Sequence, residues 1–340
     1  GPRPGSQLTD SLPVPAQFTR RTLTQIAPVA WEHPADRAAL QTLRAIPGLD
    51  ELVRKVMSFL GERGVRQLFT ADSVRVNERQ RPKLHALYTE VLETLDWPER
   101  PDLFVTQTPF VNAMAVGFEK PFIVVHTGAL GMLAEPQQRV LLGHEVGHVM
   151  SGHSTYSTLA LLFLSFGFNA IPGLGLIALP IQLALLEWYR KAEFSADRAG
   201  LLASQQPLEA MRMFLLFAGG TSDADETSLD EFLVQAQQYE SDTGAVNLLF
   251  KLLNVAGRTH PFNTVRAAEL QRWIQTGGYD TIIGGEYPRR GPGAERPLTD
   301  DYADAADYYG DKVKGMMNQM ADAARRATDT MNNAFRDESE

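Results

Sequence analysis

Apolar residues recur every three or four positions through much of the first half of the chain, which indicates helices. This spacing predicts helices over residues 35–69, broken at Pro47-Gly48, and over residues 81–95. From residue 103 the pattern changes to short apolar runs separated by Pro and Gly, which are typical of strands. These runs predict a small sheet made of residues 103–105, 113–116 and 122–125.

The helical spacing then returns. It predicts helices over residues 130–153, 193–204, 208–217, 229–239 and 245–255. Residues 159–186 carry no formal charge, but Gly and Pro divide them into two pieces of about 10 to 13 residues, each too short to cross a bilayer. We therefore expect a helical hairpin that is buried or touches a membrane, with a true membrane span as the alternative.

These patterns divide the chain into four parts. Residues 1–34 are rich in Pro, Thr and Gln and predict an extended arm, whereas residues 35–276 form the main domain. Residues 277–308 predict a linker, and residues 309–340 an amphipathic helix with an acidic tail. The predicted fold class is α+β and mostly helical, with the small sheet beside the helix of residues 130–153.

Composition narrows the range of functions. With 340 residues, of which 44% are apolar, the chain can bury a core. It has no cysteine, which excludes disulfides, thiolate zinc sites, iron–sulfur clusters and a cysteine nucleophile. The net charge of −9 and the lack of a dense Lys/Arg run argue against nucleic acid as a partner. Any metal must therefore be bound by His, Asp and Glu.

Residues 144–148 read His-Glu-Val-Gly-His, an H-E-x-x-H motif. Positions i and i+4 of a helix share a face, so His144 and His148 can bind one zinc ion. Zinc lowers the pKa of bound water towards neutrality, and Glu145 can then accept its proton. The motif predicts a zinc-dependent peptidase.

A catalytic zinc site needs a third protein ligand. Glu193 is the best candidate, because it is an acidic residue on the predicted helix just beyond the apolar hairpin. Asp197, one turn later, has the spacing to accept a hydrogen bond from the free ring nitrogen of a ligand histidine. A solvated helix face is the simpler alternative for both. His153 lies off the ligand face of a regular helix, so we expect it at the surface or in a turn, and we expect a structural role for His126.

Together, residues 144–148 and 193–197 resemble the HtpX-type and CAAX-prenyl-protease family of zinc metallopeptidases, a branch of the gluzincins. Residues 111–115, 124–130 and 259–261 resemble further elements of that family. The resemblance implies a zincin-like metalloprotease domain that binds one Zn²⁺ ion per chain. It also implies a metalloendopeptidase with peptide or protein substrates.

The resemblance assigns roles to the motif residues. It implies that His144, His148 and Glu193 are the zinc ligands. Glu145 would be the general base and later the proton donor. Asp197 would orient one of the ligand histidines.

The resemblance extends to residues outside these two motifs. His260 would stabilise the oxyanion of the tetrahedral intermediate. Arg266 matches a basic position of the family without an assigned role. An extended peptide substrate would pair with the strand formed by Asn112, Ala113, Met114 and Ala115.

Three functions follow as hypotheses. The first is a zinc metalloendopeptidase acting on extended or unfolded polypeptides. The second is a non-hydrolytic, zinc-stabilised binding or scaffold module, which Glu145 disfavours because a structural site needs no base. The third is a membrane-surface quality-control protease in which residues 159–186 contact lipid.

The sequence says less about the cellular location and the oligomeric state of the protein than about its chemistry. We expect a cytoplasmic protein, with membrane association as the alternative. The chain begins with Gly-Pro and shows no apolar signal-peptide core, so a presequence removed from this end stays an open alternative. The sequence does not define the oligomeric state.

Overall fold

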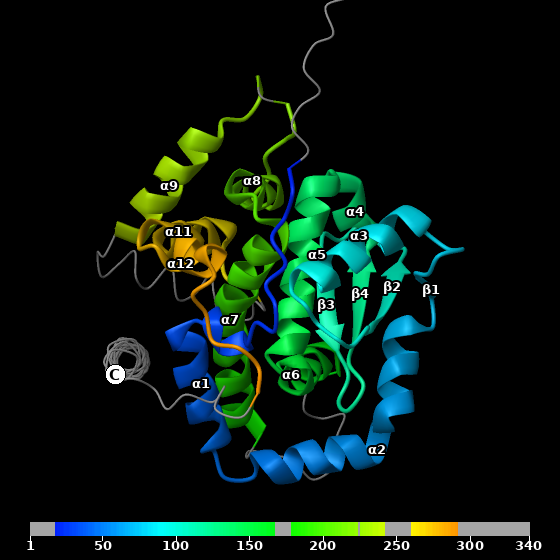
Figure 1. The fold of residues 1–340 in the computed structure, drawn as a ribbon. Helices are drawn as coiled ribbons and strands as arrows, with labels where there is room; N and C mark the ends of the chain where they lie inside the picture. The colour runs from blue at the N-terminus through cyan, green and yellow to red at the C-terminus, as the bar shows by residue number, and fades with distance from the viewer. Residues whose placement is uncertain (1–17, 167–177, 224, 242–259, 292–340) are drawn as a thin grey trace, which may run out of the picture.

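The computed structural model describes residues 18–166, 178–223, 225–241 and 260–291. A small sheet lies on one side of the molecule and a group of helices on the other (Figure 1). The helices in chain order are η1 (Pro28–Ala30), α1 (Pro34–Arg44), α2 (Leu49–Thr70), α3 (Pro82–Thr94), α4 (Thr127–Met132), α5 (Glu135–Met150), α6 (Ser154–Phe166), α7 (Ala178–Ser204), α8 (Pro207–Phe217), α9 (Leu229–Ser241), α11 (Asn263–Gln275) and α12 (Gly278–Gly284). The strands are β1 (Ser73–Arg75), β2 (Asp102–Thr106), β3 (Ala113–Val116) and β4 (Phe122–His126).

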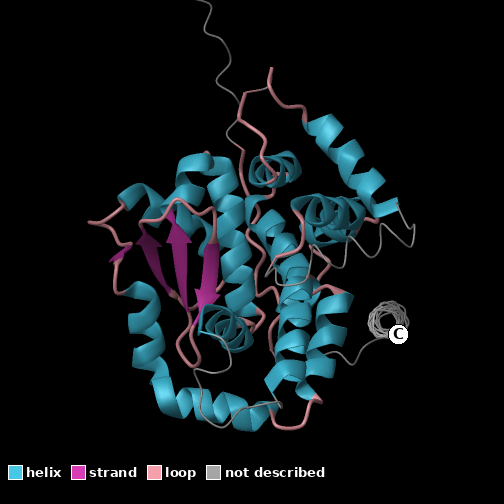
Figure 2. Ribbon diagram, turned by 180° about the vertical axis from the view of Figure 1, so that it is seen from behind, coloured by secondary structure: helices cyan, strands magenta, loops and turns pink. Residues whose placement is uncertain are grey.

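The sheet has the strand order β1-β2-β4-β3 (Figure 2). Strands β2 and β4 are parallel, and β3 is antiparallel to β4 at the edge of the sheet. The three predicted strands are confirmed, and their apolar runs reflect burial of both faces at the centre of the sheet. Strand β1 was not predicted, because its three residues are too few for a periodic pattern.

Helix α5 is the central helix and contacts the sheet through β3 and β4. Sequence spacing predicted one helix over residues 130–153, but the structure has α4 and α5 separated at Leu133 and Ala134. Pro136 explains the break, because proline has no N–H to donate and fits only the first turn of a helix. The mostly helical α+β architecture with a small sheet beside this helix is confirmed.

Helix α7 packs along α5 and forms its most extensive helix contact. It is one continuous helix of 27 residues, which joins the last part of the predicted apolar hairpin to the helix predicted over residues 193–204. Helices α6 and α7 contain the outer parts of that hairpin, whereas residues 167–177 lie outside the described residues. Among the described helices, none has both the length and the apolar character needed to cross a membrane.

The described part of the N-terminal arm contains η1 and is part of the core. Leu23, Ile26 and Trp31 are fully buried, and the Leu23 amide donates to the Thr94 carbonyl at the end of α3. Ile26 forms a β-bridge with Arg289. The arm therefore connects the sheet side of the molecule with the segment after α12.

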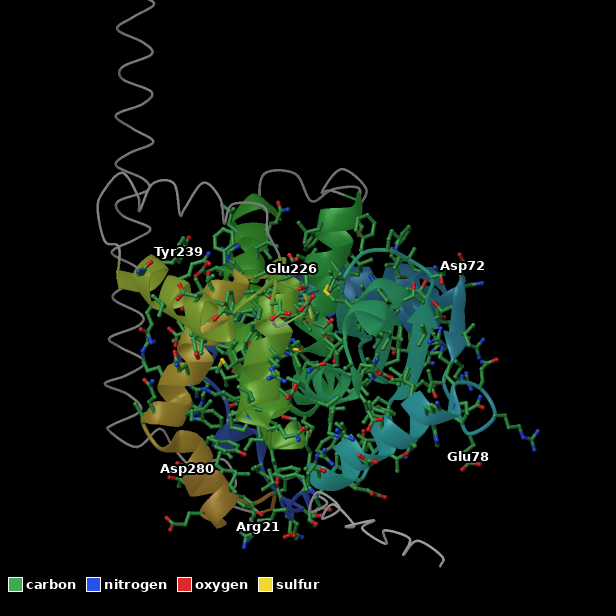
Figure 3. The ribbon with its side chains drawn as sticks, turned by 90° about the horizontal axis from the view of Figure 1, so that it is seen from above. Arg21, Asp72, Glu78, Glu226, Tyr239 and Asp280 are labelled. Atoms are coloured by element: carbon green, nitrogen blue, oxygen red, sulfur yellow. The ribbon has the colours of Figure 1, made fainter. Side chains whose placement is uncertain are left out.

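The C-terminal described segment is more ordered than the sequence suggested. Helix α11 was not predicted, and α12 lies in residues 277–308, for which we expected a linker. Viewed from above, Asp72 and Glu78 lie at the sheet end of the molecule, and Tyr239 and Asp280 lie at the opposite, helical end (Figure 3). The predicted helix 245–255 and the segment 309–340 lie outside the described residues.

Glycines allow α5 and α7 to approach closely. A Cβ atom at Gly143 would overlap the side chain of Ala203, and one at Gly147 would overlap that of Ala199. Both glycines flank or lie within the H-E-x-x-H motif, so the contact fixes the position of the motif against α7.

The substitution Gly143→Ala should lower the free energy of unfolding by about 1–3 kcal/mol, because the added methyl group overpacks this contact. Urea denaturation measures the change. Gly131→Ala in α4 is the matched control, since its Cβ would meet nothing within 4 Å and should leave stability unchanged or slightly raised. Equal effects of the two substitutions would contradict close packing at Gly143.

Candidate metal centre

Two helices bring the predicted metal ligands together. His144 and His148 lie one turn apart on α5, and Glu193 lies on the facing side of α7. All three are at most 3% exposed. Their candidate ligand atoms lie within 4.8 Å of one another, the one such group of His and acidic side chains among the described residues.

The distances within this group suit a tetrahedral metal ion. The two Nε2 atoms of His144 and His148 are 3.2 Å apart. Glu193 places Oε1 3.2 Å from Nε2 of His148 and Oε2 3.4 Å from Nε2 of His144. Ligands about 2.0–2.1 Å from a tetrahedral zinc ion are about 3.3 Å from one another. In addition, Glu193 Oε2 is buried without a hydrogen-bond partner in the described structure, so the group fits a zinc site.

Asp197 contacts His144 on the ring side opposite Glu193, and Arg266 in turn contacts Asp197. Asp197 Oδ1 lies 2.9 Å from Nδ1 of His144, on the side of the ring away from Glu193. The Arg266 guanidinium donates to both carboxylate oxygens of Asp197, at 2.9 Å through Nε and 2.5 Å through Nη2. Arg266 comes from α11 and is 5% exposed. No role could be assigned to Arg266 from the sequence, and the structure pairs it with the carboxylate that is expected to orient His144.

His153 lies in the turn between α5 and α6, one of its two expected positions, and outside the group of predicted ligands. The other expected position, at the surface, is wrong, because His153 is only 2% exposed. Its Nδ1 is 3.0 Å from Nδ1 of His148, and its Nε2 is 3.1 Å from Oδ2 of Asp36. It reaches these partners because α5 ends at Met150 and Gly152, at a φ of +68°, turns the chain back. Neither His153 nor Asp36 carries a motif signal in the sequence.

Burial and charge shift the pKa values of the cluster. Burial lowers the pKa of His148 to about 4 and raises the pKa of Glu145 to about 7. Burial acts downward on His144 as well, but Glu193 and Asp197 raise its pKa to about 10. Burial acts upward on Glu193, but the neighbouring histidines hold its pKa well below the usual value. The negative charge of Glu193 that favours protonation of His144 would also favour a metal cation beside Nε2 of this ring.

A cavity of about 440 Å³ opens beside the cluster. His260 lines it and places Nε2 3.6 Å from Oε2 of Glu193. Asn112 and Ala113, at the start of the edge strand, also line it, whereas Met114 and Ala115 do not. Beyond these residues, the apolar part of the cavity wall is formed by Phe110, Val111, Leu141, Phe217, Pro261 and Phe262. The polar part also includes His144, Glu145, Glu193, Asn263 and Arg266.

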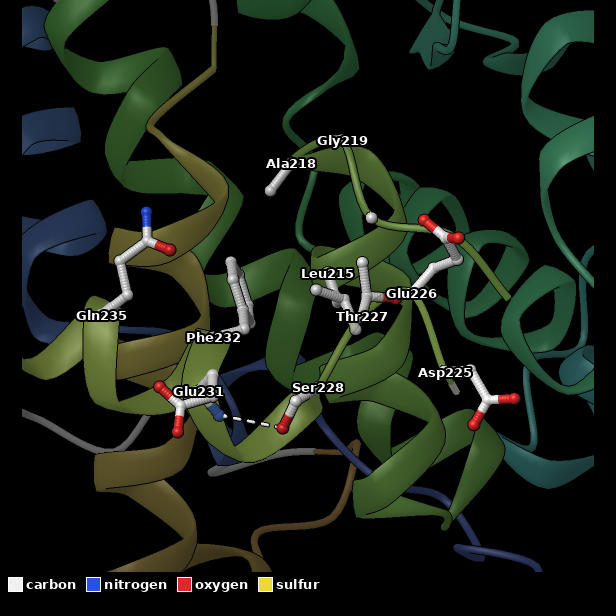
Figure 4. A pocket seen from close by; sticks show the side chains of 11 residues that line it. Leu215, Ala218, Gly219, Asp225, Glu226, Thr227, Ser228, Glu231, Phe232 and Gln235 are labelled. Atoms are coloured by element: carbon white, nitrogen blue, oxygen red, sulfur yellow. Dashed lines mark hydrogen bonds between the residues drawn. The ribbon is translucent and has the colours of Figure 1, made fainter. Parts of the chain in front are cut away.

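A second cavity, of about 550 Å³, lies between the end of α8 and α9 (Figure 4). Its wall includes Asp225, Glu226 and Glu231, together with Phe232. None of the residues that line it belongs to the His–Glu cluster. The chemistry predicted from the motif is therefore confined to the first cavity.

Comparison with known proteins agrees with the peptidase chemistry that the H-E-x-x-H motif predicts. The sequence model of peptidase family M48 matches residues 78–274. The plastoglobule-localized metallopeptidase 48, chloroplastic, of Arabidopsis thaliana is 34% identical over 258 residues, which is 74% of either chain. A protease HtpX homolog of Moorella thermoacetica is 33% identical over 98 residues, or 28% of this chain and 32% of its own. A protease HtpX homolog of Ralstonia pickettii is 25% identical over 65% of this chain and 83% of its own. No solved structure matches.

The substitution Arg266→Ala should lower the free energy of unfolding by about 3–5 kcal/mol, because it leaves the buried Asp197 carboxylate without its cation. Urea denaturation of the metal-free protein isolates this effect. Arg212→Ala, which removes a surface pair with Glu209 in which the arginine is 51% exposed, should change stability by at most about 1 kcal/mol. The account of Asp197 would be wrong if both variants lost the same stability.

Proposed function

The chain belongs to peptidase family M48 and is a metallopeptidase, and from this premise we propose that it is a zinc-dependent endopeptidase that cleaves extended or unfolded polypeptides. The predicted resemblance to HtpX-type proteases is confirmed. One observation carries the proposal: His144, His148 and Glu193 converge beside a cavity, which is lined by His144, Glu193 and Glu145.

The three converging side chains would bind the metal. Zinc is the preferred ion because two imidazoles and one carboxylate, with an open position at the cavity, are a typical catalytic zinc set. When bound, zinc supplies a Lewis acid that polarises the scissile carbonyl and acidifies water. Asp197 would accept the Nδ1 proton of His144, which leaves Nε2 free to bind.

Glu145 has the environment of a general base. Its Oε2 atom is buried and has no hydrogen-bond partner among the described residues. Burial raises its pKa to about 7, so that it can accept a proton near neutral pH and release it again. Glu145 would therefore take a proton from the attacking water and deliver it to the leaving amine.

His260 is the proposed donor to the developing oxyanion. It comes from the segment before α11 and lines the same cavity as Glu145. The edge of its ring packs against Tyr189 at a centroid distance of 5.7 Å, which limits its orientation. An imidazole N–H held at this wall could donate to the carbonyl oxygen of a bound peptide.

The edge strand and the apolar wall support an extended substrate. Strand β3 pairs only with β4 among the described strands, and its first residue lines the cavity. A peptide that adds to this edge must be extended, because its main-chain N–H and C=O groups would pair with those of β3. Phe110, which is 73% exposed at the cavity wall, offers an apolar surface to substrate side chains.

The other hypotheses have less support. The buried Glu145 carboxylate, whose Oε2 atom has no hydrogen-bond partner among the described residues, disfavours a scaffold role, for which no base is needed. Neither the cytoplasmic location nor lipid contact through residues 159–186 is tested, and both stay predictions. The same holds for the oligomeric state.

The substitution Glu145→Gln should reduce kcat by about 10²–10⁴-fold, because it removes the base and leaves the ligands in place. Hydrolysis of casein and the zinc content of the purified protein measure the two parts of this statement. Both wild type and variant should bind one zinc ion per chain. Glu135→Gln is the matched control on the same helix; its side chain is 73% exposed, so activity should not change.

Two results would contradict the proposal. A Glu145→Gln variant that kept wild-type activity would exclude Glu145 as the base. A wild-type protein that bound no zinc after purification without chelators would exclude the zinc site itself.

A further inference from the structure

Two further buried side chains, those of His153 and Asp36, hold His148, the second predicted ligand histidine, through consecutive hydrogen bonds. His148 faces the metal position with Nε2, and its Nδ1 lies 3.0 Å from Nδ1 of His153. The other nitrogen of His153, Nε2, lies 3.1 Å from Oδ2 of Asp36. All three residues are at most 3% exposed, so the protein alone decides how these groups share protons.

Metal binding fixes the direction of both hydrogen bonds. A neutral His148 that binds through the lone pair of Nε2 carries its proton on Nδ1. This N–H then donates to Nδ1 of His153, which must be an acceptor. His153 therefore carries its own proton on Nε2 and donates it to the Asp36 carboxylate. Each ring nitrogen of His148 and His153 then has one role, as metal ligand, hydrogen-bond donor or hydrogen-bond acceptor.

Asp36 is itself fixed in position by α7. It accepts hydrogen bonds from Nε1 of Trp188 at 3.0 Å and from Oγ of Ser195 at 2.6 Å. It is 1% exposed, and although burial acts upward, His153 and these donors keep its pKa low. Ser195 lies two residues from Glu193 along the chain. The start of α1 is thus tied to the metal-binding turn of α7.

The arrangement parallels that of the first ligand histidine. Asp197 contacts Nδ1 of His144 directly, whereas Asp36 reaches Nδ1 of His148 through the ring of His153. Asp36 precedes residues 78–274, which match the family model, whereas His153 lies within them. The N-terminal segment therefore supplies only the carboxylate of this arrangement.

We infer that Asp36 and His153 are positioning residues of the metal centre, which select the tautomer of His148 that binds metal and hold its ring in place. The inference rests on the proposed function, because it assumes a metal ion between His148 and Glu193. It makes the start of α1 a determinant of metal affinity rather than only part of the core.

Zinc affinity tests the inference independently of peptidase activity. The substitution His153→Phe keeps a ring but removes the acceptor for His148, and should raise the zinc Kd by about 10- to 100-fold. His153→Asn places an amide oxygen near the former Nδ1, so it should recover part of that loss. Asp36→Asn removes the charge at the far end and should raise the Kd in the same direction. Competition with a chromophoric chelator measures each value.

A merely structural role predicts a different pattern, and Tyr88→Phe is the control for it. Tyr88 is also buried, at 1% exposure, but it lies on α3 and its hydroxyl donates to the carbonyl oxygen of Pro101 at 2.9 Å, outside the hydrogen bonds that join His148, His153 and Asp36. We expect this variant to lose stability in the metal-free protein and to keep the wild-type zinc Kd when folded. Thermal unfolding of each metal-free variant separates the two effects.

The outcomes distinguish the two levels of the account. If His153→Phe kept the wild-type zinc Kd within twofold, the positioning role would be wrong and the peptidase proposal would stand. If His153→Phe does not fold, the zinc Kd values of His153→Asn and Asp36→Asn decide the question in the same way. A rise in Kd for Tyr88→Phe equal to that for His153→Phe would also overturn the positioning role. A wild-type protein without zinc would instead overturn the proposed function.

Discussion

The close approach of α5 and α7 is the constraint on which the metal centre depends. Two of the three predicted ligands lie on α5 and the third on α7, so the distance between these helices sets the spacing of the three side chains. Glycine is used where the helices are closest; a Cβ at Gly200 of α7 would lie 2.7 Å from the carbonyl oxygen of Val140 on α5. A larger residue at such a position would separate the helices and open the site beyond the reach of one ion.

Buried charge is the second feature that organises the centre. Glu145, Glu193 and Asp197 are each at most 3% exposed and surround two histidines. Such a concentration of carboxylates is unfavourable in the interior unless cations balance it. Arg266 supplies one positive charge, through its bidentate pair with Asp197. A divalent metal between the ligands would supply the rest, so metal binding and stability of this region should be coupled.

The sequence was informative where chemistry or periodicity is local. The H-E-x-x-H motif and the pair Glu193 and Asp197 each depend on spacing within one helix, and the structure brings them together as expected; their individual roles remain predictions. The three longer strands were found because buried strands have continuous apolar runs. The spacing of apolar residues did not predict β1, because this strand is too short. It also did not predict the start of α5, because apolar spacing continues across the break that precedes Pro136.

What the sequence could not show depends on tertiary contacts. Asp36 meets its partners Trp188 and Ser195 across 152 and 159 residues, and no local pattern links them. The positions of His153 and Arg266 likewise depend on a turn and on the packing of α11.

The central claim is that one metal ion lies between His144, His148 and Glu193. Anomalous diffraction at the zinc absorption edge, from crystals of the purified protein, tests it most directly. The account predicts one peak per chain, about 2.0–2.2 Å from Nε2 of each histidine and from a carboxylate oxygen of Glu193. A zinc peak elsewhere, or none at this position in zinc-supplied crystals, would contradict it.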